Sequence, residues 1–370
     1  MTVNLQDPSL ITHQSYINGQ WVDADSGETL DVTNPATGQL IGVVAKCGTA
    51  ETRRMIEAAA EAQKSWCETT AKQRAALLRK WYDLIMANQE DLAQILTAEQ
   101  GKPLAEARGE IVYGANYIEW FGEESKRVYG DTIPQPSNDK RVMVIKQPVG
   151  VVACITPWNF PNAMLTRKIA PAIAAGCSVV VKPANATPLS ALALMVLAER
   201  AGFPPGLVNI VTGRTAEIGA EITANPLVRK VTFTGSTPVG KQLIAECAAT
   251  VKRTSMELGG NAPFIVFDDA DIDAAVQGAL ISKYRNAGQT CVCSNRILVQ
   301  ASVAATFIEK FTAAVSDLTL GNGADEGVIV GPLIDRKAAH SVCEFIDDAV
   351  AKGATVVAGG GMSEVGQCFV

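Results

Sequence analysis

Short runs of β-branched residues alternate with stretches of helix length from Val149 onward, and this alternation constrains the fold more than any other feature of the chain. The runs predict strands at 151–155, 179–181, 208–211 and 231–233. Strands that are separated by helix-length crossovers lie parallel in one sheet, with helices packed on its two faces. We therefore predict an α/β fold built on a doubly wound parallel sheet.

The segments on either side of this pattern have different signatures. An Asn-Gly pair between apolar residues of 16–22 predicts a β-hairpin, and the apolar residues of 50–130 recur at helical spacing. The Pro-containing stretch 130–147 predicts a protruding strand pair. We predict two domains, 1–258 around the parallel sheet and 259–370 with a second α/β pattern.

Local signals refine the ends of several elements. Thr187-Pro188 and Thr237-Pro238 each combine a capping hydroxyl with a proline suited to the first helical position, so each predicts a helix start. In the second domain, 264–267 predicts a strand, and a helix is predicted from about Asp271 into the loop before Cys291.

The composition excludes several classes of partner. A net charge of −6 gives no basic surface for nucleic acid, and the longest apolar run, 169–181, is too short to cross a membrane. The nine cysteines are dispersed, which is typical of reduced thiols in a reducing compartment. No targeting segment is visible at the start. We expect a cytoplasmic protein without nucleic-acid or membrane partners.

Cys291 is a candidate nucleophile. It follows a small, polar, loop-forming run, and such a loop can bring sulfur to the end of a pocket while leaving backbone N–H groups free to stabilise charge. The alternative is a buried cysteine that only packs, because free cysteine is usually buried.

Three further stretches are candidates for the same chemistry. Asn159 lies in a stiff Pro-Trp-Asn-Phe-Pro turn after a strand, and its amide suits either an oxyanion hole or a structural turn. Gly235 lies between a strand and a helix, which is either a dinucleotide site or a plain turn. Glu257, among apolar residues and glycines, is either a partly desolvated general base or a surface carboxylate.

Together, a thiol, an amide donor, an isolated glutamate and a cofactor turn suggest oxidation through an acyl-enzyme. With these motifs the chain resembles the aldehyde dehydrogenase superfamily from the N-terminal hairpin to the last residue, and most closely its bacterial succinate-semialdehyde branch. In that family the cysteine of Gly-Gln-Thr-Cys is the nucleophile, the glutamate of Glu-Leu-Gly-Gly is the general base, and the asparagine of Pro-Trp-Asn-Phe-Pro is the oxyanion donor. The resemblance implies these roles for Cys291, Glu257 and Asn159.

The resemblance also implies a nicotinamide cofactor and a substrate with a distal carboxylate. Arg167 and Arg285 match arginines that bind this carboxylate in the semialdehyde branch, although solvated or salt-bridged arginines are the alternative. Many NAD-preferring relatives carry glutamate where this chain has Asn185, so we expect NADP to be preferred and NAD tolerated, without a metal. The cofactor contacts implied are Ile155, Thr156, Pro157, Trp158, Lys182, Pro183, Ala184, Asn185, Gly213, Phe233, Thr234, Gly235, Ser236 and Leu258.

The expected reaction is the oxidation of succinate semialdehyde to succinate through a thiohemiacetal and a thioester on Cys291. Glutarate semialdehyde is an alternative, because a hydrophobic pocket discriminates one methylene by only about 1–3 kcal/mol. A CoA-acylating relative is disfavoured because that branch typically lacks the glutamate that Glu257 supplies. The pair at 130–147 resembles the oligomerisation hairpin of the family and implies a homodimer or homotetramer.

Two expectations concern the neighbourhood of the nucleophile and the end of the chain. Cys293 lies two residues after Cys291, and the pair either forms a reversible disulfide that disables the nucleophile or leaves Cys293 to pack. The resemblance implies a further C-terminal part beyond Val370, with a nicotinamide-ribose glutamate, a substrate-loop serine and a subunit-pairing strand. We therefore expect either a piece of a longer protein or a truncated product, which leaves an inactive or merely binding fragment as a further alternative.

Overall fold

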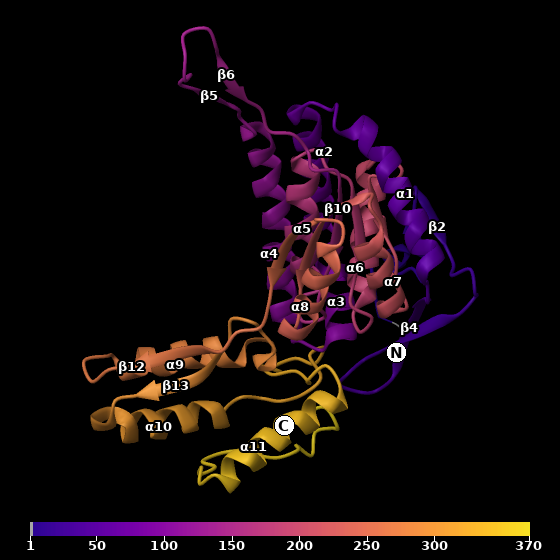
Figure 1. Cartoon of the computed structure of the whole chain (residues 1–370). Helices are drawn as coiled ribbons and strands as arrows, with labels where there is room; N and C mark the ends of the chain where they lie inside the picture. The colour runs from indigo at the N-terminus through magenta and orange to yellow at the C-terminus, as the bar shows by residue number, and fades with distance from the viewer. Residues whose placement is uncertain (1–2) are drawn as a thin grey trace.

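The computed structural model describes residues 3–370, and its centre is a seven-stranded sheet (Figure 1). The strands are β1 (Ser15–Ile17), β2 (Gln20–Val22), β3 (Thr29–Thr33), β4 (Leu40–Ala45), β5 (Asp131–Ile133), β6 (Val142–Val144), β7 (Val151–Ile155), β8 (Val179–Lys182), β9 (Val208–Ile210), β10 (Val228–Thr234), β11 (Arg253–Glu257), β12 (Ala262–Val266) and β13 (Ser294–Val299). The α-helices are α1 (Thr49–Trp66), α2 (Ala71–Ala87), α3 (Gln89–Gln100), α4 (Leu104–Glu124), α5 (Ala163–Ala174), α6 (Pro188–Ala201), α7 (Thr215–Ala224), α8 (Thr237–Ala248), α9 (Ile272–Tyr284), α10 (Ala301–Ser316) and α11 (Arg336–Ala351). Short 3-10 turns are η1 (Pro8–Leu10), η2 (Ser125–Arg127) and η3 (Arg285–Gly288).

The order of the strands in the central sheet is β11-β10-β7-β8-β9-β1-β2. The five strands from β11 to β9 are parallel, as the alternating pattern predicts, and the N-terminal hairpin β1-β2 adds to the edge in antiparallel fashion. Asn18 and Gly19 form the hairpin turn with φ of 51° and 77°, the left-handed values that an Asn-Gly turn requires. The pairing of this hairpin with β9 was not predicted.

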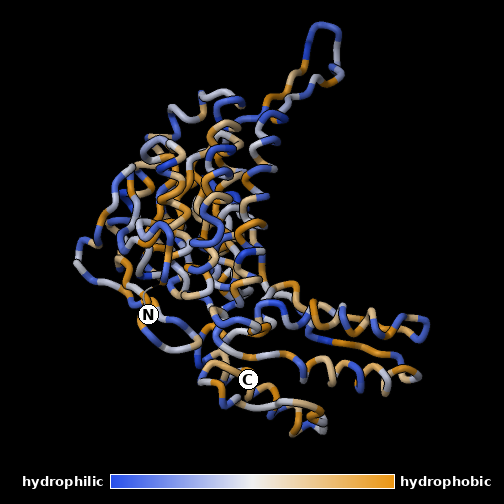
Figure 2. The backbone as a smooth tube through the Cα atoms, turned by 180° about the vertical axis from the view of Figure 1, so that it is seen from behind, coloured by the Kyte–Doolittle hydropathy of each residue, from blue (hydrophilic) through white to orange (hydrophobic). Residues whose placement is uncertain are grey.

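The sheet is buried on both faces. Successive side chains of a strand point to opposite faces, so Val152 and Cys154 of β7 join one apolar core while Val151 and Ala153 join the other. Helices α5 and α6, backed by α2 and α4, cover the first face, and α1 and α7 cover the second. Figure 2 shows the hydrophobic segments concentrated in this central body.

The direction of the chain reverses between β7 and β10. From β7 the chain runs through β8 to β9 on one side, and then returns to place β10 and β11 on the other side of β7. In sheets of this kind the crevice outside the carboxyl ends of the strands at such a point is where ligands bind. The segments after Ile155 and after Thr234 therefore lie side by side at the site edge of the sheet.

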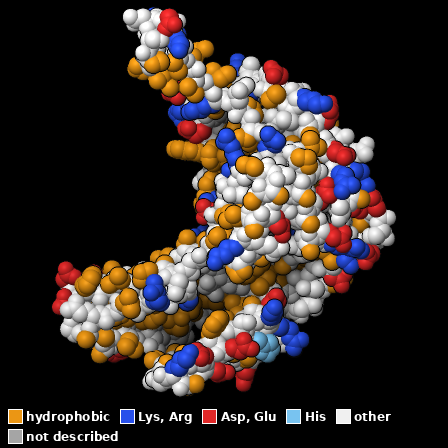
Figure 3. All heavy atoms as spheres, in the orientation of Figure 1, with side chains coloured by type: hydrophobic (Ala, Val, Ile, Leu, Met, Phe, Trp, Pro, Cys, Tyr) orange, Lys and Arg blue, Asp and Glu red, His pale blue; other side chains and the backbone are white. Residues whose placement is uncertain are grey.

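Two parts project from the central body (Figure 1). The hairpin β5-β6 is the protruding pair predicted at 130–147, and it exposes Ile133, Met143 and Val144. Beyond β11, the parallel pair β12-β13 packs against α9 and α10, and exposes Ile265 and Leu298. Figure 3 shows hydrophobic side chains gathered on both projections. Within residues 3–370 the structure has no helix long and apolar enough to span a membrane.

The predicted capping of α6 by the Thr187 hydroxyl is wrong. Thr187 is the N-cap residue, but its Oγ1 is buried without a partner, and the carboxylate of Glu99 accepts from the N–H groups of Leu189 and Ser190 instead (2.7 and 2.8 Å). A carboxyl group replaces the hydroxyl because its two oxygens accept both bonds, and burial raises the pKa of Glu99 to about 8. In α8 the cap residue is Ser236, one position before Thr237.

The core between α2 and α4 gives a test of the fold. Leu78→Ala removes a side chain that is 0% exposed and should lower the free energy of unfolding by about 2–5 kcal/mol, because a cavity adds to the lost transfer energy. Leu40→Ala, the same change at a 54% exposed position, should lower it by less than about 1 kcal/mol. Urea unfolding followed by circular dichroism measures both values, and equal losses would contradict this packing.

Candidate active site

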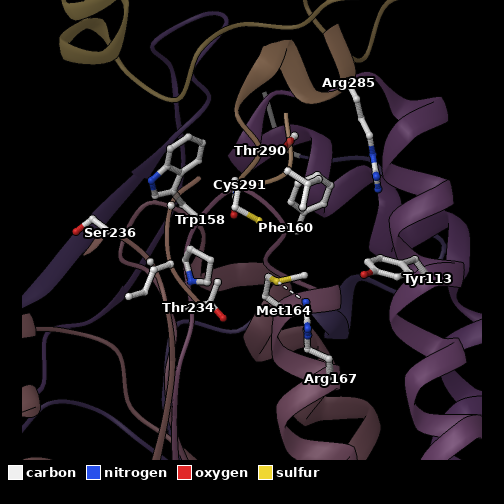
Figure 4. A pocket seen from close by; sticks show the side chains of 16 residues that line it. Tyr113, Trp158, Phe160, Met164, Arg167, Thr234, Ser236, Arg285, Thr290 and Cys291 are labelled. Carbon is white, nitrogen blue, oxygen red and sulfur yellow. Dashed lines mark hydrogen bonds between the residues drawn. The ribbon is translucent and has the colours of Figure 1, made fainter. Parts of the chain in front are cut away.

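A cavity of about 330 Å³ opens at the reversal point of the sheet, outside the carboxyl ends of β7 and β10. Figure 4 shows the side chains that line it, with the sulfur of Cys291 directed into it. Its lining comprises Tyr113, Pro157, Trp158, Asn159, Phe160, Met164, Arg167, Thr234, Gly235, Ser236, Leu258, Gly259, Arg285, Thr290, Cys291 and Val292. The structure thus brings together the candidate nucleophile, the candidate oxyanion donor, both arginines and part of the cofactor set.

The loop that carries Cys291 depends on an unusual backbone. After α9 the chain adopts positive φ at Asn286, Ala287 and Gly288 (53°, 54° and 74°), a left-handed run that turns it back toward the cavity. Such angles cost energy for residues other than glycine, so the surroundings must hold them. The carboxylate of Glu106 in α4 accepts from the Asn286 N–H (2.9 Å), and the Asn286 side chain is buried beneath the loop.

The thiol of Cys291 is accessible. Cys291 is classed as exposed, whereas the other cysteines of the chain are buried or half-buried. Within residues 3–370, the Cys291 N–H donates to no protein acceptor, although the N–H groups of Thr290, one position before it, and Cys293, two positions after it, donate to backbone carbonyls. Cys291 therefore offers both an accessible thiol, which can attack a carbonyl carbon, and an available N–H, which can stabilise the oxyanion that forms.

Asn159 is held from both ends. Its backbone oxygen accepts from Lys102 Nζ (2.8 Å) and from Asn286 Nδ2 (3.0 Å), while its own Nδ2 donates to the Gln289 carbonyl (2.9 Å). One of the two hydrogens on Nδ2 is used in this bond, which leaves the other for a ligand. The side chain thereby bridges the turn after β7 and the loop of Cys291.

The cavity has two chemically different sides. In Figure 4, Trp158, Thr234 and Ser236 lie on one side of Cys291, and Tyr113, Arg167 and Arg285 lie on the other. Ion pairs of 4.0 Å or less in the described part of the chain include neither arginine. The Arg167 guanidinium lies 5.5 Å from the Tyr117 ring centre and that of Arg285 lies 5.0 Å from the Phe160 ring centre.

A pair of tyrosines, Tyr113 and Tyr117, lies beside Arg167. The hydroxyl groups of Tyr113 and Tyr117 lie 2.6 Å apart, and burial together with this hydrogen bond raises the pKa of Tyr117 to about 12. Tyr113 and Met164 were missed in the sequence, because their spacing in α4 and α5 is that of ordinary core-facing helices. Both positions could be found only once these helices were known to lie beside the cavity.

The first side of the cavity fits a dinucleotide. Thr234 Oγ1 is buried without a partner among residues 3–370, and a Cβ at Gly235 would lie 2.4 Å from the Phe233 ring, so this position before α8 accommodates only glycine. The N-terminus of α8, which begins at Thr237, is suited to a phosphate. Ile155, Thr156 and Pro157 lie at the adjacent end of β7.

A second group of predicted cofactor residues lies at the end of β8. Lys182 is buried and donates to the Pro183 carbonyl (2.8 Å) and to Asn185 Oδ1 (2.7 Å), and burial lowers the pKa of Lys182 to about 8. Asn185 Nδ2 donates to the Gly213 carbonyl (2.8 Å), so four of the predicted residues form one network. Ala184 lies in the turn between them.

Glu257 differs from the expectation of a partly desolvated carboxylate. Its side chain is exposed and is outside the lining of the cavity, while its backbone carbonyl accepts from the Gly235 N–H (3.0 Å). The reason is topological, because β11 is the edge strand of the sheet and lacks a neighbour that would cover its end. Its neighbours in the sequence, Leu258 and Gly259, do line the cavity.

Cys291 and Cys293 are both free thiols in the structure. Cys293 is 1% exposed, and its sulfur donates to the Lys283 carbonyl (3.4 Å) under the loop. A disulfide between the two would require the loop to rearrange, so the redox switch stays a prediction.

The fold and the cavity define an α/β enzyme that binds a dinucleotide and presents an exposed cysteine beside it. The family model described as "Aldehyde dehydrogenase family" matches residues 21–369. The chain belongs to the aldehyde dehydrogenase family and is an NAD(P)-dependent oxidoreductase. This confirms the resemblance and the fold class.

The relatives are close in sequence and in structure. The chain is 62% identical to glutarate-semialdehyde dehydrogenase of Pseudomonas aeruginosa and 59% identical to the NADP(+) succinate-semialdehyde dehydrogenase of Escherichia coli. Each match covers 99% of this chain and 76% of the relative. The crystal structure of an NADP-dependent enzyme of E. coli matches with a TM-score of 0.98 and 59% identity, over 99% of this chain and 76% of that one.

The exposure of Cys291 leads to a test of thiol selectivity. Under limiting iodoacetamide, Cys291 should be alkylated well before the half-buried Cys67, because burial and the nearby Glu68 raise the pKa of Cys67. Peptide mass spectrometry after brief labelling measures both sites in one sample. Equal labelling of Cys67 and Cys291 would contradict the geometry described here.

Proposed function

We propose that this chain carries out the oxidation of succinate semialdehyde to succinate, with NADP preferred and NAD tolerated. The observation that carries the substrate assignment is the pair of arginines without carboxylate partners, Arg167 and Arg285, on one side of the exposed thiol. A planar guanidinium binds both oxygens of a carboxylate, and the semialdehyde has a carboxylate at the end opposite its aldehyde. The names of the relatives support the same substrate class.

Cys291 performs the first step. Its thiolate attacks the aldehyde carbon, a C–S bond forms, and the carbonyl oxygen becomes an alkoxide. The free Cys291 N–H and the remaining hydrogen on Asn159 Nδ2 are the donors that stabilise this charge. Arg167 and Arg285 meanwhile fix the far end of the substrate, which keeps the aldehyde carbon near the sulfur.

The oxidation step needs the nicotinamide ring, which when bound accepts a hydride from the substrate carbon. The residues proposed to hold the cofactor are the network of Lys182, Asn185 and Gly213 together with Gly235 and Ser236 at the start of α8. Loss of the hydride leaves a thioester on Cys291. Asn185 carries no negative charge, so a 2′-phosphate meets no repulsion there and Lys182 adds attraction.

Hydrolysis completes the cycle. Glu257 is proposed to remove a proton from a water molecule, which attacks the thioester carbonyl and releases the acid and the Cys291 thiol. Because the Glu257 side chain is exposed in this structure, it reaches that water only by turning toward the cavity. Glu257 is the last residue of β11 and is followed by Leu258, Gly259 and Gly260.

Glutarate semialdehyde is the second candidate substrate, and the 62% identical Pseudomonas relative carries that name. The longer substrate has the same two end groups, so both arginines would serve it equally.

The exposed hairpin β5-β6 supports assembly into a homodimer or homotetramer. The domain boundary is proposed near residue 258, between the end of β11 and the start of β12.

The substrate assignment is tested by absorbance at 340 nm with succinate semialdehyde and NADP. The wild-type chain should reduce the cofactor and Cys291→Ala should not. Arg167→Met should raise KM for the semialdehyde by roughly 10- to 100-fold, because a charge-assisted hydrogen bond contributes about 1.5–3 kcal/mol.

Butanal, a four-carbon aldehyde without a carboxylate, is the matched control. Its kcat/KM should be low in the wild-type chain and unchanged by Arg167→Met. An equal loss for both aldehydes would show that Arg167 has another role, and a wild-type chain that is folded yet inactive toward the semialdehyde would refute the assignment.

The cofactor preference is tested by Asn185→Glu. A carboxylate there should repel the 2′-phosphate and lower kcat/KM for NADP by at least about tenfold, since like charges about 4 Å apart near a protein surface repel by up to about 4 kcal/mol. The value for NAD should stay the same or rise. Initial rates with both cofactors give the ratio, and a wild-type ratio that clearly favours NAD would overturn the proposed preference.

A further inference from the structure

A buried ion pair lies directly behind the turn that carries Asn159. Lys102 Nζ and Glu110 Oε2 are 2.6 Å apart, and their side chains are 0% and 1% exposed. The ammonium also donates to the Asn159 carbonyl (2.8 Å) and lies 3.9 Å from the centre of the Phe160 ring. The hydrogen bonds and the ring contact of this ammonium thus go to Glu110 and to the turn at 159–160, while Glu106 and Arg285 are further charged groups nearby.

The carboxylate of this pair reaches the other end of the same turn. Glu110 Oε1 accepts from the N–H groups of Asn162 (3.0 Å) and Ala163 (3.2 Å), where α5 begins. The free N–H groups at a helix N-terminus favour a negative charge, so this position suits a carboxylate. Hydrogen bonds therefore hold the turn from Asn159 to Asn162 at both ends, from Lys102 at Asn159 and from Glu110 at Asn162.

The backbone of Lys102 is itself fixed by close packing. Gly101 has φ of 95°, and a Cβ at Gly323 would lie 2.4 Å from the Lys102 carbonyl oxygen. A Cβ at Gly331 would lie 2.2 Å from the carbonyl oxygen of Gly101. These three glycines allow the backbone around Lys102 to pack closely against residues 323–331, which follow the Cys291 loop in the sequence. The backbone of Lys102 therefore has little freedom to move.

The turn and the Cys291 loop are joined by hydrogen bonds through Asn286. Its Nδ2 donates to the carbonyls of Asn159 (3.0 Å) and Gln289 (3.3 Å), and Asn159 Nδ2 donates to the same Gln289 carbonyl. Displacement of the Asn159 backbone would therefore change where its carboxamide lies relative to Cys291.

We infer that Lys102 and Glu110 are positioning residues for Asn159, which hold its carboxamide where the oxyanion forms. This inference rests on the role of Asn159 in the proposed function. Neither residue lines the cavity, so neither touches the substrate. Their effect on the reaction passes through the geometry of the turn, and a displacement of about 1 Å in such a group costs about 100-fold in rate.

A double-mutant cycle tests this inference. Lys102→Met should lower kcat/KM about 100-fold in the wild-type background, and should change it by less than about twofold in an Asn159→Ala background, because groups that act through one another are not additive. The cycle is also run on acylation by p-nitrophenyl acetate, which needs no cofactor. In that reaction the Cys291 sulfur bonds to the acetyl carbon while the bond to p-nitrophenolate breaks, and the released phenolate is measured by absorbance.

Two further variants control for effects on folding. Lys102→Met/Glu110→Gln removes both buried charges and keeps the carbonyl that caps α5, so it carries the same cycle if the single variant does not fold. Lys252→Met is the matched control, because it makes the same change at another buried lysine. Lys252 Nζ donates to the carbonyls of Asn225 and Val228, which lie at the start of β10, whereas the cavity lies at the other end of this strand, beside Thr234. It should leave both reactions unchanged while destabilising the fold.

The outcomes separate this inference from the proposed function. Equal losses for Lys102→Met in the wild-type and Asn159→Ala backgrounds, no loss at all, or the same loss in Lys252→Met would each overturn the positioning role. If ester acylation follows the expected cycle but succinate semialdehyde is not oxidised, the positioning role stands and the substrate assignment fails. If the semialdehyde is oxidised and the cycle is additive, only the positioning role fails.

Discussion

The parallel pairing of β7 with β10 is the interaction on which the rest of the structure depends. Its register sets Ile155 opposite Phe233, so both strands end at the same edge of the sheet. The backbone must leave the sheet there in two different turns, and the space between them is where the cavity opens. A slip of one residue in this ladder would turn Val152 and Cys154 from one apolar core toward the other.

Buried carboxylates extend this frame into the helices. Glu99 accepts from the first N–H groups of α6, and Glu110 does the same for α5. Glu99 thus connects α3 to α6, and Glu110 connects α4 to α5. Both α5 and α6 pack directly on the sheet, so these bonds join the outer helices to the inner ones. Burial raises the pKa of Glu99 to about 8. Glu110 has Lys102 as a buried cationic partner, which offsets the cost of burying its charge.

Much of this arrangement could be predicted from local patterns in the sequence. β-branched runs separated by helix-length segments predicted the parallel sheet, and the Asn-Gly pair predicted the hairpin β1-β2. The turns carrying Asn159 and Cys291 were predicted because their residue types restrict the backbone. Contacts between distant segments were not predictable: the carboxylate cap of α6 lies ninety positions before that helix, and the exposure of Glu257 follows from the edge position of β11. Tyr113 joins the cavity only because α4 packs against α5.

The two-sided layout of the cavity has a consequence for how this chain can diversify. The groups on one side of Cys291 come from the ends of β7 and β10, whereas those on the other come from α4, α5 and the segment after α9. The residues proposed for the aldehyde therefore lie on different elements from those proposed for the cofactor. A substitution in α4 or α5 can alter the aldehyde side of the cavity while leaving the carboxyl ends of β7 and β10 unchanged.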